Sequence, residues 1–422
     1  MGGRGKLKTK PEAHRACRFC GVPLNRIFVD LGSSPLCQTY ITPNNWGQAE
    51  PFYPLYAFVC DECWLVQLGE HVAPNVIFKA NYPYYSSYSE SWAEHARRYA
   101  VAMRQRFGIA PNSLVMEVGS NDGYLLRHFL DAGVQVLGID PAAGVVEAAQ
   151  QLGVETVVEF LGCGTAREIV AAHGKANLLV GNNVLAHVPD LNDFIGGIKI
   201  LLGRTSVLTM EFPHLLRLIQ GNQFDTIYHE HYFYFWFSTV RRIFAEHGIT
   251  LFDVEELPTH GGSLRIYGRH AEDDSKKVED RVQKLLRLEE AMGWNDLATY
   301  DSFAAEIHET KRKILDFLIC AKREGKTIVG YGAPGKGNTL LNYCGIRTDF
   351  LDYTVDRNPQ KQGNYTPGTR IPILNPAKIR ETRPDYILIL PWNLRDEIAC
   401  QLRYVAEWGG KLVVPIPEPT VL

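Results

Sequence analysis

The sequence predicts an α/β protein with three parts: a small cysteine-bearing module at the amino end, followed by two Rossmann-like α/β domains. Two observations support this expectation. Four cysteines stand as two C-x-x-C pairs near the start, and two later segments each run strand, glycine-rich turn, helix and strand. A chain of 422 residues is long enough for each part to bury an apolar core. We expect an extension at 1–16, the cysteine module at 17–75, the first α/β domain at 76–272 and the second at 273–422.

The composition is that of an ordinary globular protein. Apolar residues make up 45% and charged residues 22% of the chain, and the formal net charge is -3. Because phosphate neutralisation by Lys and Arg supplies most nucleic-acid affinity, this balance argues against a nucleic-acid partner. No apolar run reaches the roughly 18 residues that span a membrane, and the first sixteen residues lack the apolar centre of a signal peptide. With an odd number of cysteines and no heptad pattern, we expect a cytoplasmic monomer.

The four paired cysteines predict a metal site. Each C-x-x-C pair places two thiolates on one turn, and two such turns can complete a tetrahedron around zinc. Four protein ligands leave no open coordination position, so we expect a structural zinc ion; the alternative is two unrelated redox or surface pairs. The expected ligands are Cys17, Cys20, Cys60 and Cys63.

The segment SLVMEVGSNDGYLLRHFLDAGVQVLGIDPA, at 113–142, predicts the first β-α-β unit. Its glycines let the backbone approach a ligand, and a carboxylate about 20 residues further on can accept both hydroxyls of a ribose. The turn lacks the G-x-G-x-x-G spacing that holds a pyrophosphate and presents acidic and amide groups instead. Such a turn suits a cationic sulfonium with an amino-acid tail, and E-x-G-x-N-x-G resembles the first motif of class I methyltransferases. We therefore expect S-adenosylmethionine to bind here, the alternative being a plain α/β domain with an empty crevice; the expected residues are Glu117, Gly119, Asn121, Asp122, Gly123 and Asp140.

The rest of this domain follows the pattern of a doubly wound sheet. An amphipathic helix is predicted from Glu90 onward, ahead of the first strand. Asn183 and His187 follow an apolar run at its carboxyl end, which is where open α/β sheets bind ligands. Segments 249–259 and 261–270 predict the final pair of strands.

A cluster of ionisable residues beside an aromatic run predicts the catalytic centre. The cluster Tyr228-His229-Glu230-His231 is followed by six aromatic residues. Burying that many ionisable groups costs free energy unless they are paired, which favours a functional role. Methylation of a carbon beside a ketone needs a base that removes a proton, and histidine titrates near neutrality. Glu230 would orient the base or hold hydroxyls, and Tyr228 would stabilise an enolate oxygen; the alternative is a second metal site or a core histidine.

The segment IVGYGAPGKGNTLLNYCGI, at 328–346, predicts the second β-α-β unit, after a polar helical stretch from about 274. Backbone amides at a helix start, together with a lysine, make an anion site that would fit the diphosphate of a nucleotide-sugar. The alternative is a structural turn without a ligand. The expected substrate-binding residues are Gly335, Lys336, Asn338, Asp356 and Lys361, with Arg370, Trp392 and Asn393 as further candidates.

Several motifs together resemble one family. They are the two C-x-x-C pairs, EVGSNDGYLL, GIDPA, GNNVLAHVPD, TIYHEHY, HGGSLR, GYGAPGKGNTLLNYCGI and PGTRIPI. In this order, from Cys17 to the end of the chain, they resemble the bacterial sugar C-methyltransferases of deoxysugar biosynthesis, which act on dTDP-linked keto-sugars.

The resemblance implies a reaction and a set of site residues. The reaction is transfer of a methyl group from S-adenosylmethionine to carbon, at C-3 of a dTDP-linked 4-keto-deoxysugar, with His231 as the base. Tyr228, Glu230 and Tyr82 would surround the sugar. The methyl donor would lie against Gly119, Asn121, Asp140 and Asn183. Methylation at C-5 or on a hydroxyl oxygen, and a non-catalytic nucleotide-sugar-binding protein, remain alternatives.

Overall fold

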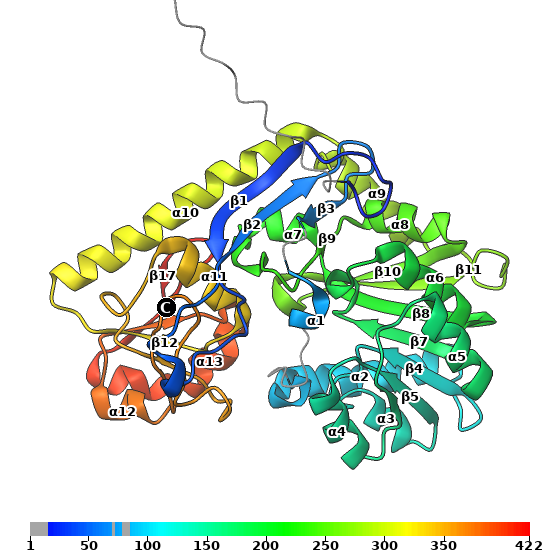
Figure 1. The fold of residues 1–422 in the computed structure, drawn as a ribbon, viewed down its shortest axis with the longest axis horizontal. Helices are drawn as coiled ribbons and strands as arrows, with labels where there is room; N and C mark the ends of the chain where they lie inside the picture. Colours follow the sequence, from blue (N-terminus) through cyan, green and yellow to red (C-terminus); the bar gives the residue numbers. More distant parts are fainter. Residues whose placement is uncertain (1–15, 70–71, 78–84) are drawn as a thin grey trace, which may run out of the picture.

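The structure, a computed structural model, describes residues 16–69, 72–77 and 85–422, and Figure 1 shows their arrangement. The expected extension at 1–16 lies outside the described residues except for its last position. Two mainly parallel sheets with helices around them follow the amino-terminal cysteine module, so the predicted α/β class is confirmed. Within the described ranges, no helix is both long enough and apolar enough to cross a membrane.

The amino-terminal module is an antiparallel sheet that takes its last strand from the next domain. Its own strands are β1 (Arg26–Ser34), β2 (Tyr53–Val59) and β3 (Val66–Leu68). The two-residue strand β9 (Phe233–Tyr234) pairs with β3 and completes the sheet. Because β9 follows the Tyr-His-Glu-His cluster directly, this pairing joins the predicted catalytic segment to the cysteine module.

One long helix, α2 (Glu90–Phe107), leads into the first α/β domain, as predicted. Ser89 caps its amino end by accepting a hydrogen bond from the Trp92 amide at 3.3 Å. Gly108 ends it in a left-handed conformation with φ 64°. The buried side chains recur every three or four residues, as expected for an amphipathic helix, and are Trp92, Ala96, Tyr99, Ala100 and Met103.

The first α/β domain is a seven-stranded sheet with the order β10-β11-β8-β7-β4-β5-β6. The neighbouring strands β8, β7, β4, β5 and β6 run parallel, whereas β11 is antiparallel to both β8 and β10. The strands are β4 (Leu114–Val118), β5 (Gln135–Ile139), β6 (Thr156–Val157), β7 (Ala176–Asn182), β8 (Leu202–Pro213), β10 (Ile249–Leu257) and β11 (Ser263–His270). The helices are α3 (Leu126–Leu130), α4 (Ala143–Gln151), α5 (Cys163–His173), α6 (Leu191–Leu201), α7 (Leu215–Gln220) and α8 (Phe237–Glu246). The strand order reverses beside β4, so groups at the ends of β4, β5 and β7 meet in one crevice.

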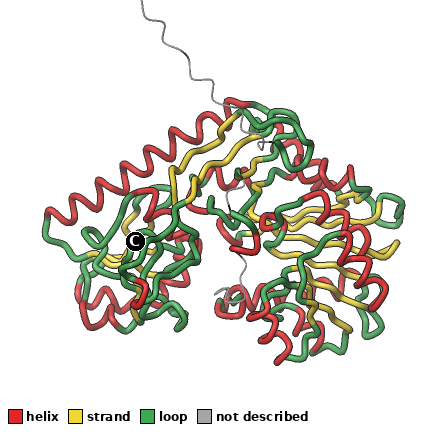
Figure 2. The backbone as a smooth tube through the Cα atoms, viewed as in Figure 1, coloured by secondary structure: helices red, strands yellow, loops and turns green. Residues whose placement is uncertain are grey.

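The second α/β domain has a six-stranded sheet with the order β14-β13-β12-β15-β16-β17. Its strands are parallel apart from the last one, and Figure 2 shows this sheet separate from that of the first domain. Helices α9 (Asp280–Ala291) and α10 (Leu297–Arg323) precede it. Its strands are β12 (Ile328–Tyr331), β13 (Thr354–Val355), β14 (Ile373–Leu374), β15 (Tyr386–Ile389), β16 (Lys411–Val414) and β17 (Thr420–Val421), and its helices are α11 (Gly335–Cys344), α12 (Lys378–Thr382) and α13 (Arg395–Gln401).

Aromatic contacts hold the cysteine module against the long helix α10, beside which β1 and β2 run in Figure 1. Phe28 of β1 stacks on Phe303 of α10 with 4.8 Å between ring centroids. Trp64, before β3, stacks on Tyr300 at 5.9 Å. The buried side chains of these elements belong to the same apolar core as β12 and β15. The module is therefore held by α10 on one side and by β9 on the other.

A buried carboxylate joins α9 to the start of α8. Glu289 is fully buried and accepts hydrogen bonds from the backbone amides of Phe237 (2.6 Å) and Ser238 (2.7 Å) and from the Ser238 hydroxyl (2.6 Å). His214 contacts the same carboxylate at 2.7 Å. The first amides of a helix have no partner within the helix, so this acid acts as a cap supplied by a neighbouring helix.

We expect the substitution Glu289→Ala to destabilise the fold. It would leave the α8 amides buried without acceptors and should lower the free energy of unfolding by about 3 to 5 kcal/mol. Urea denaturation followed by tryptophan fluorescence measures the loss. The matched control is Glu290→Ala, an exposed neighbour on the same helix, which should change stability by less than about 0.5 kcal/mol. Equal transition midpoints for the two variants would contradict the assignment.

Candidate active site

The four predicted metal ligands meet in one cluster of the cysteine module. Their sulfur atoms all lie within 4.8 Å of one another; Cys17 Sγ is 3.5 Å from Cys63 Sγ, and Cys20 Sγ is 3.6 Å from Cys60 Sγ. Tetrahedral zinc with bonds of about 2.3 Å separates its sulfur ligands by about 3.8 Å, so the cluster fits this ion. The buried side-chain amide of Gln67 donates to Cys17 Sγ at 3.1 Å, which stabilises a thiolate.

The predicted cofactor turn forms at the carboxyl end of β4, where the strand order reverses. Gly119 (φ 71°) and Gly123 (φ 76°) are left-handed, and so is Asn121 (φ 48°), which is uncommon for a residue with a side chain. Asp140 ends β5 beside the turn, and its carboxylate accepts the backbone amides of Asn121 and Ala142, both at 2.9 Å. The structure thus brings the glycine turn and the second-strand acid together.

Glu117 makes this crevice strongly acidic. It is fully buried, and the hydrogen bond from Tyr124 only partly opposes the effect of burial on its carboxylate. Burial raises the pKa of Glu117 well above its ordinary value, and the nearby charges of Asp140 and Asp122 raise it further. A positively charged ligand would offset this repulsion. These acidic side chains therefore fit the positively charged sulfonium and ammonium groups of S-adenosylmethionine.

The segment before α2 is anchored on the same turn. Asn121 Oδ1 accepts the Ser86 amide at 2.9 Å, and Asp122 Oδ2 accepts the Ser87 amide at 3.1 Å. Tyr82, predicted to lie near the sugar, comes shortly before Ser86 in the sequence and is outside the described residues.

Asn183 lies on the opposite wall of the crevice, just past β7. It is left-handed (φ 53°), its backbone amide donates to the Glu211 carbonyl at 2.7 Å, and its Nδ2 is 3.1 Å from His260 Nε2. His260 also has a positive φ (53°) and meets Trp92 edge-on at 5.0 Å. Such strained residues gather at functional sites. His260 begins the HGGSLR motif, but the sequence analysis assigned it no role.

His231 has the geometry of a general base. Its Nδ1 is 2.8 Å from the carbonyl oxygen of Thr226, and because a carbonyl oxygen only accepts, Nδ1 carries the hydrogen. Nε2 is therefore the nitrogen with the lone pair. Tyr228 packs against the imidazole at 4.1 Å between ring centroids, and His187 meets it edge-on at 4.7 Å.

The surroundings keep this imidazole neutral. Burial lowers the pKa of His231 well below its ordinary 6.5, and the charges of His187, Lys336 and His260 lower it further, while the hydrogen bond to Thr226 opposes them. Burial also lowers the pKa of His187 and of His260 to about 4. The neutral form is the one that accepts a proton.

The other two ionisable members of the cluster point to different neighbours. His229 Nε2 is 3.1 Å from the carbonyl oxygen of Pro54, and the ring meets Tyr53 edge-on at 5.9 Å. Glu230 is buried and accepts a hydrogen bond from Cys37 Sγ at 3.4 Å. Both side chains therefore contact the cysteine module, since Pro54 and Cys37 each belong to it.

Lys336 extends from α11 toward the first α/β domain. Its Nζ donates to Asn393 Oδ1 at 3.0 Å and lies 4.6 Å from the centre of the Trp392 ring. Trp392 Nε1 in turn donates to Asp225 Oδ2 at 2.8 Å, across the boundary between the two domains. The charge of Lys336 also contributes to lowering the pKa of His231.

Two of the predicted substrate ligands contact the cysteine module. Asn338 Nδ2 donates to the Cys37 carbonyl at 2.7 Å. A Cβ at Gly335 would lie 3.0 Å from Cys37 Sγ, so glycine permits the close approach of this segment.

The remaining two substrate candidates hold the glycine turn of the second domain. Asp356 Oδ2 accepts the Ala333 amide at 2.8 Å. Lys361 Nζ donates to the Ala333 carbonyl at 3.0 Å and forms an ion pair with Asp356 at 3.5 Å. This pair therefore shapes the backbone from which Lys336 extends.

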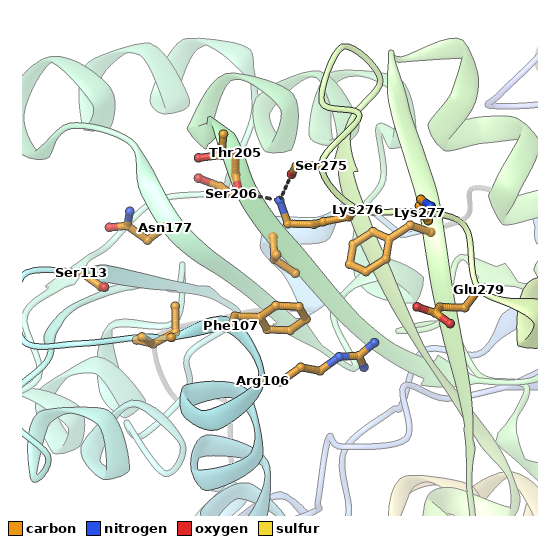
Figure 3. A pocket seen from close by; sticks show the side chains of 14 residues that line it. Arg106, Phe107, Ser113, Asn177, Thr205, Ser206, Ser275, Lys276, Lys277 and Glu279 are labelled. Atoms are coloured by element: carbon orange, nitrogen blue, oxygen red, sulfur yellow. Dashed lines mark hydrogen bonds between the residues drawn. The ribbon is translucent and has the colours of Figure 1, made fainter.

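A cavity of about 620 Å³ opens at the amino ends of the parallel strands of the first sheet, opposite the predicted cofactor turn. It is lined near the amino ends of three strands by Ser113, Asn177 and Ser206, and Figure 3 shows Lys276 beside it. Lys276 Nζ already donates to the Thr205 carbonyl at 2.8 Å. Since ligands of open α/β sheets bind at the carboxyl ends and no predicted site residue lines this cavity, it is separate from the candidate site.

Comparison with known proteins identifies the family. A zinc binding domain matches residues 17–78, a methyltransferase domain matches 92–254, and a C-methyltransferase C-terminal domain matches 258–417. C-methyltransferase NovU from Streptomyces niveus is 36% identical over 406 residues, covering 96% of this chain and 96% of the relative. The chain belongs to the C-methyltransferase family.

Two cofactor predictions are confirmed by this membership together with the geometry. The C-methyltransferase uses S-adenosylmethionine as its methyl donor. Its four clustered cysteines, within the matched zinc binding domain, hold a structural zinc ion.

Solved structures resemble part of the C-methyltransferase. Magnesium protoporphyrin IX methyltransferase from Synechocystis PCC 6803 has a TM-score of 0.35 at 17% identity, over 42% of this chain and 82% of that chain. The 1,6-didemethyltoxoflavin-N1-methyltransferase of Burkholderia thailandensis has a TM-score of 0.35 at 16% identity, over 49% of this chain and 95% of that chain.

We expect loss of zinc to unfold the cysteine module and to release the segment around His231, because β9 pairs with β3 beside the metal cluster. Cys60→Ser should contain little zinc by elemental analysis and should be cleaved within 17–69 by low concentrations of protease. The matched control is Cys320→Ser, an exposed cysteine outside the cluster, which should keep its zinc and its resistance. Protease resistance in zinc-free Cys60→Ser would contradict the prediction.

Proposed function

We propose that this C-methyltransferase methylates C-3 of a dTDP-linked 4-keto-deoxysugar, with His231 as the base. The observation that supports the proposal best is the single tautomer of His231, which directs its hydrogen to Thr226 and leaves Nε2 as the proton acceptor. The acceptor class follows from the resemblance to sugar C-methyltransferases. A ketone at C-4 acidifies the hydrogen on C-3, so a neutral imidazole can remove it.

The proton step uses the two nitrogens of His231 differently. Nε2 takes the proton from C-3, and the electron pair of the broken C–H bond moves toward the C-4 oxygen to form an enolate. The imidazolium that results keeps its Nδ1–H directed at the Thr226 carbonyl, whose partial negative charge stabilises it. No rotation of the ring is needed during the step.

The enolate needs donors and the sugar needs fixed hydroxyl contacts. In the proposal, Tyr228, whose ring is tilted against the imidazole with 4.1 Å between centroids, donates a hydrogen bond to the enolate oxygen. Glu230, buried beside the base, accepts from sugar hydroxyls. The resemblance also implies Tyr82 among the residues around the sugar; it lies outside the described residues.

When bound, S-adenosylmethionine would supply an electrophilic methyl group: C-3 of the enolate would form a new C–C bond to it while the methyl C–S bond breaks, its electron pair stays on sulfur, and S-adenosylhomocysteine leaves. In the proposal, the left-handed turn at Gly119, Asn121 and Gly123 allows close backbone approach, and Asp140 accepts the ribose hydroxyls. Glu117 and Asp122 offset the positive charge of the donor, and Asn183 forms the opposite wall.

The second α/β domain is proposed to hold the nucleotide. Lys336 makes the contact to the diphosphate, because its ammonium has hydrogens beyond the one donated to Asn393. Gly335, Asn338, Asp356 and Lys361 shape the turn that carries it. Such an acceptor is a cytoplasmic metabolite, in keeping with the free cysteines of the described chain.

We expect His231→Gln to slow removal of the C-3 proton strongly. In deuterated buffer with S-adenosylhomocysteine, the wild type should exchange the C-3 hydrogen of a dTDP-4-keto-sugar, and the variant should do so about 10²-fold to 10⁴-fold more slowly. Mass spectrometry and NMR of the recovered sugar measure the rate and the carbon.

The matched control is His229→Gln, a neighbouring histidine whose nitrogen faces the Pro54 carbonyl. It should exchange within about threefold of the wild type. Exchange by His231→Gln at the wild-type rate would rule out His231 as the base. Exchange of the hydrogen on C-5 instead of C-3 would indicate that C-5 is the methylated carbon.

The pH profile should show the lowered pKa of the base. Protonation inactivates the imidazole, so an ordinary histidine would lose half its activity near its pKa of 6.5; because burial and neighbouring charges lower the pKa of His231, kcat should hold through pH 6.5 and fall only below it. Initial rates at saturating substrates measure this, with calorimetric S-adenosylmethionine binding at each pH as the control. An acid limb centred at or above 6.5 would contradict it.

A further inference from the structure

Trp392 of the second α/β domain reaches the turn beside the base. It begins the short helix η6 (Trp392–Leu394), which follows β15, and only 8% of its surface is exposed. Its indole Nε1 donates to Asp225 Oδ2 at 2.8 Å. Asp225 belongs to η4 (Phe224–Thr226) of the methyltransferase domain. One hydrogen bond therefore joins two domains directly next to the catalytic segment.

The turn that receives this bond also orients the imidazole. Thr226, the neighbour of Asp225, supplies the carbonyl that accepts from His231 Nδ1 at 2.8 Å. Backbone hydrogen bonds close the turn on both sides, from the Thr226 amide to the Gln223 carbonyl (3.1 Å) and from Ile227 to Phe224 (3.0 Å). In so short a turn, displacement of Asp225 displaces the Thr226 carbonyl as well.

The indole ring is fixed on two sides. Lys336 Nζ lies 4.6 Å from the ring centre, which is a cation–π contact. Against the ring edge lies Gly261 (φ 88°), where a Cβ would come within 2.6 Å of Trp392 Cη2, so only glycine leaves room for the ring. Gly261 follows His260, which contacts Asn183 of the proposed S-adenosylmethionine site. The indole therefore contacts both turns that line the crevice.

Asp225 depends on this bond for its burial. Its Oδ1 has no hydrogen-bond partner among the described residues, and the carboxylate is fully buried. Burial raises the pKa of Asp225 to about 6, while the charge of Lys336 and the bond from Trp392 oppose the rise. Removing a donor from a buried acceptor costs more free energy than an exposed bond does, so the docked arrangement is the favoured one.

We propose that Trp392 is a positioning residue through which docking of the second α/β domain orients the His231 base. The proposal rests on the function proposed above and deepens it. With the indole in place, the turn at Asp225 presents the Thr226 carbonyl to Nδ1 and holds Nε2 available for the acceptor. Without it the turn relaxes, and the imidazole no longer has one tautomer. The domain that is proposed to hold the nucleotide thus also acts on the chemical step.

The test compares two Trp→Phe substitutions. Trp392→Phe keeps an aromatic ring against Gly261 and Lys336 but removes the indole donor. Trp408→Phe is the matched control, because Trp408 Nε1 donates to the Pro384 carbonyl at 3.0 Å entirely within the second domain. Any general effect of losing an indole hydrogen bond should appear in both variants.

The first readout needs no acceptor. In full-length protein labelled with ¹⁵N in histidine, the His231 signal is the one absent from His231→Gln. We expect the Nδ1–H tautomer in the wild type and in Trp408→Phe, and a mixture of tautomers in Trp392→Phe. An unchanged His231 signal in Trp392→Phe would overturn the proposal. Inactivity of the wild type toward keto-sugars would instead count against the proposed function and leave this readout intact.

The second readout is kinetic. Trp392→Phe should lower kcat about 10-fold to 100-fold, the size expected for a misplaced catalytic group, while its KM for S-adenosylmethionine stays within about twofold. Asp225→Ala removes the other partner of the same bond and should have a similar effect. The double variant should then be no slower than the slower single variant. Multiplying losses, or equal losses in Trp392→Phe and Trp408→Phe, would overturn the proposal.

Discussion

The hydrogen bond from His231 Nδ1 to the Thr226 carbonyl is the interaction on which the proposed chemistry depends. A histidine in water exchanges its hydrogen between two nitrogens, whereas a buried one facing a carbonyl keeps it on one. Around this bond, burial and the charge of Lys336 favour the neutral imidazole. The orientation and the protonation state of this imidazole are therefore both set by its protein surroundings.

All three parts of the chain contribute to holding that base. The cysteine module does so by pairing its strand β3, near the zinc cluster, with β9 of the first α/β domain. With only two residues, β9 would be too short to persist alone. The second α/β domain does so through Trp392 and Asp225. Zinc has no part in the proposed reaction. It stabilises the cysteine module, whose sheet the segment after His231 joins through β9.

Two buried acids show how the same residue type serves different ends. Glu289 accepts hydrogen bonds from the Phe237 and Ser238 amides and from the Ser238 hydroxyl, and its role is to complete a helix end. Glu117 is buried with a hydrogen bond from Tyr124, and the charges of two further acids, Asp140 and Asp122, act on it. A buried carboxylate with all its contacts made is structural, whereas one without them favours a cationic ligand.

The sequence by itself determined the features that depend on neighbouring residues. The spacing of each C-x-x-C pair, the glycine turn after Glu117 and the acid at Asp140 could all be predicted, because tight turns and strand ends are set by residues a few positions apart. The pattern also predicted both β-α-β units and their order. Spacing alone did not distinguish His229 from His231, and the expectation that His231 is the base came from the family resemblance.

Only the tertiary structure decided which side chains meet. His229 faces Pro54, which lies 175 positions away in the chain, and β9 pairs with β3 of the cysteine module. Trp392 and Asp225 likewise carry no shared local signal. The physical reason is that hydrogen-bond partners and burial, which set tautomer and pKa, come from packing between elements, whereas sequence patterns record only the elements themselves.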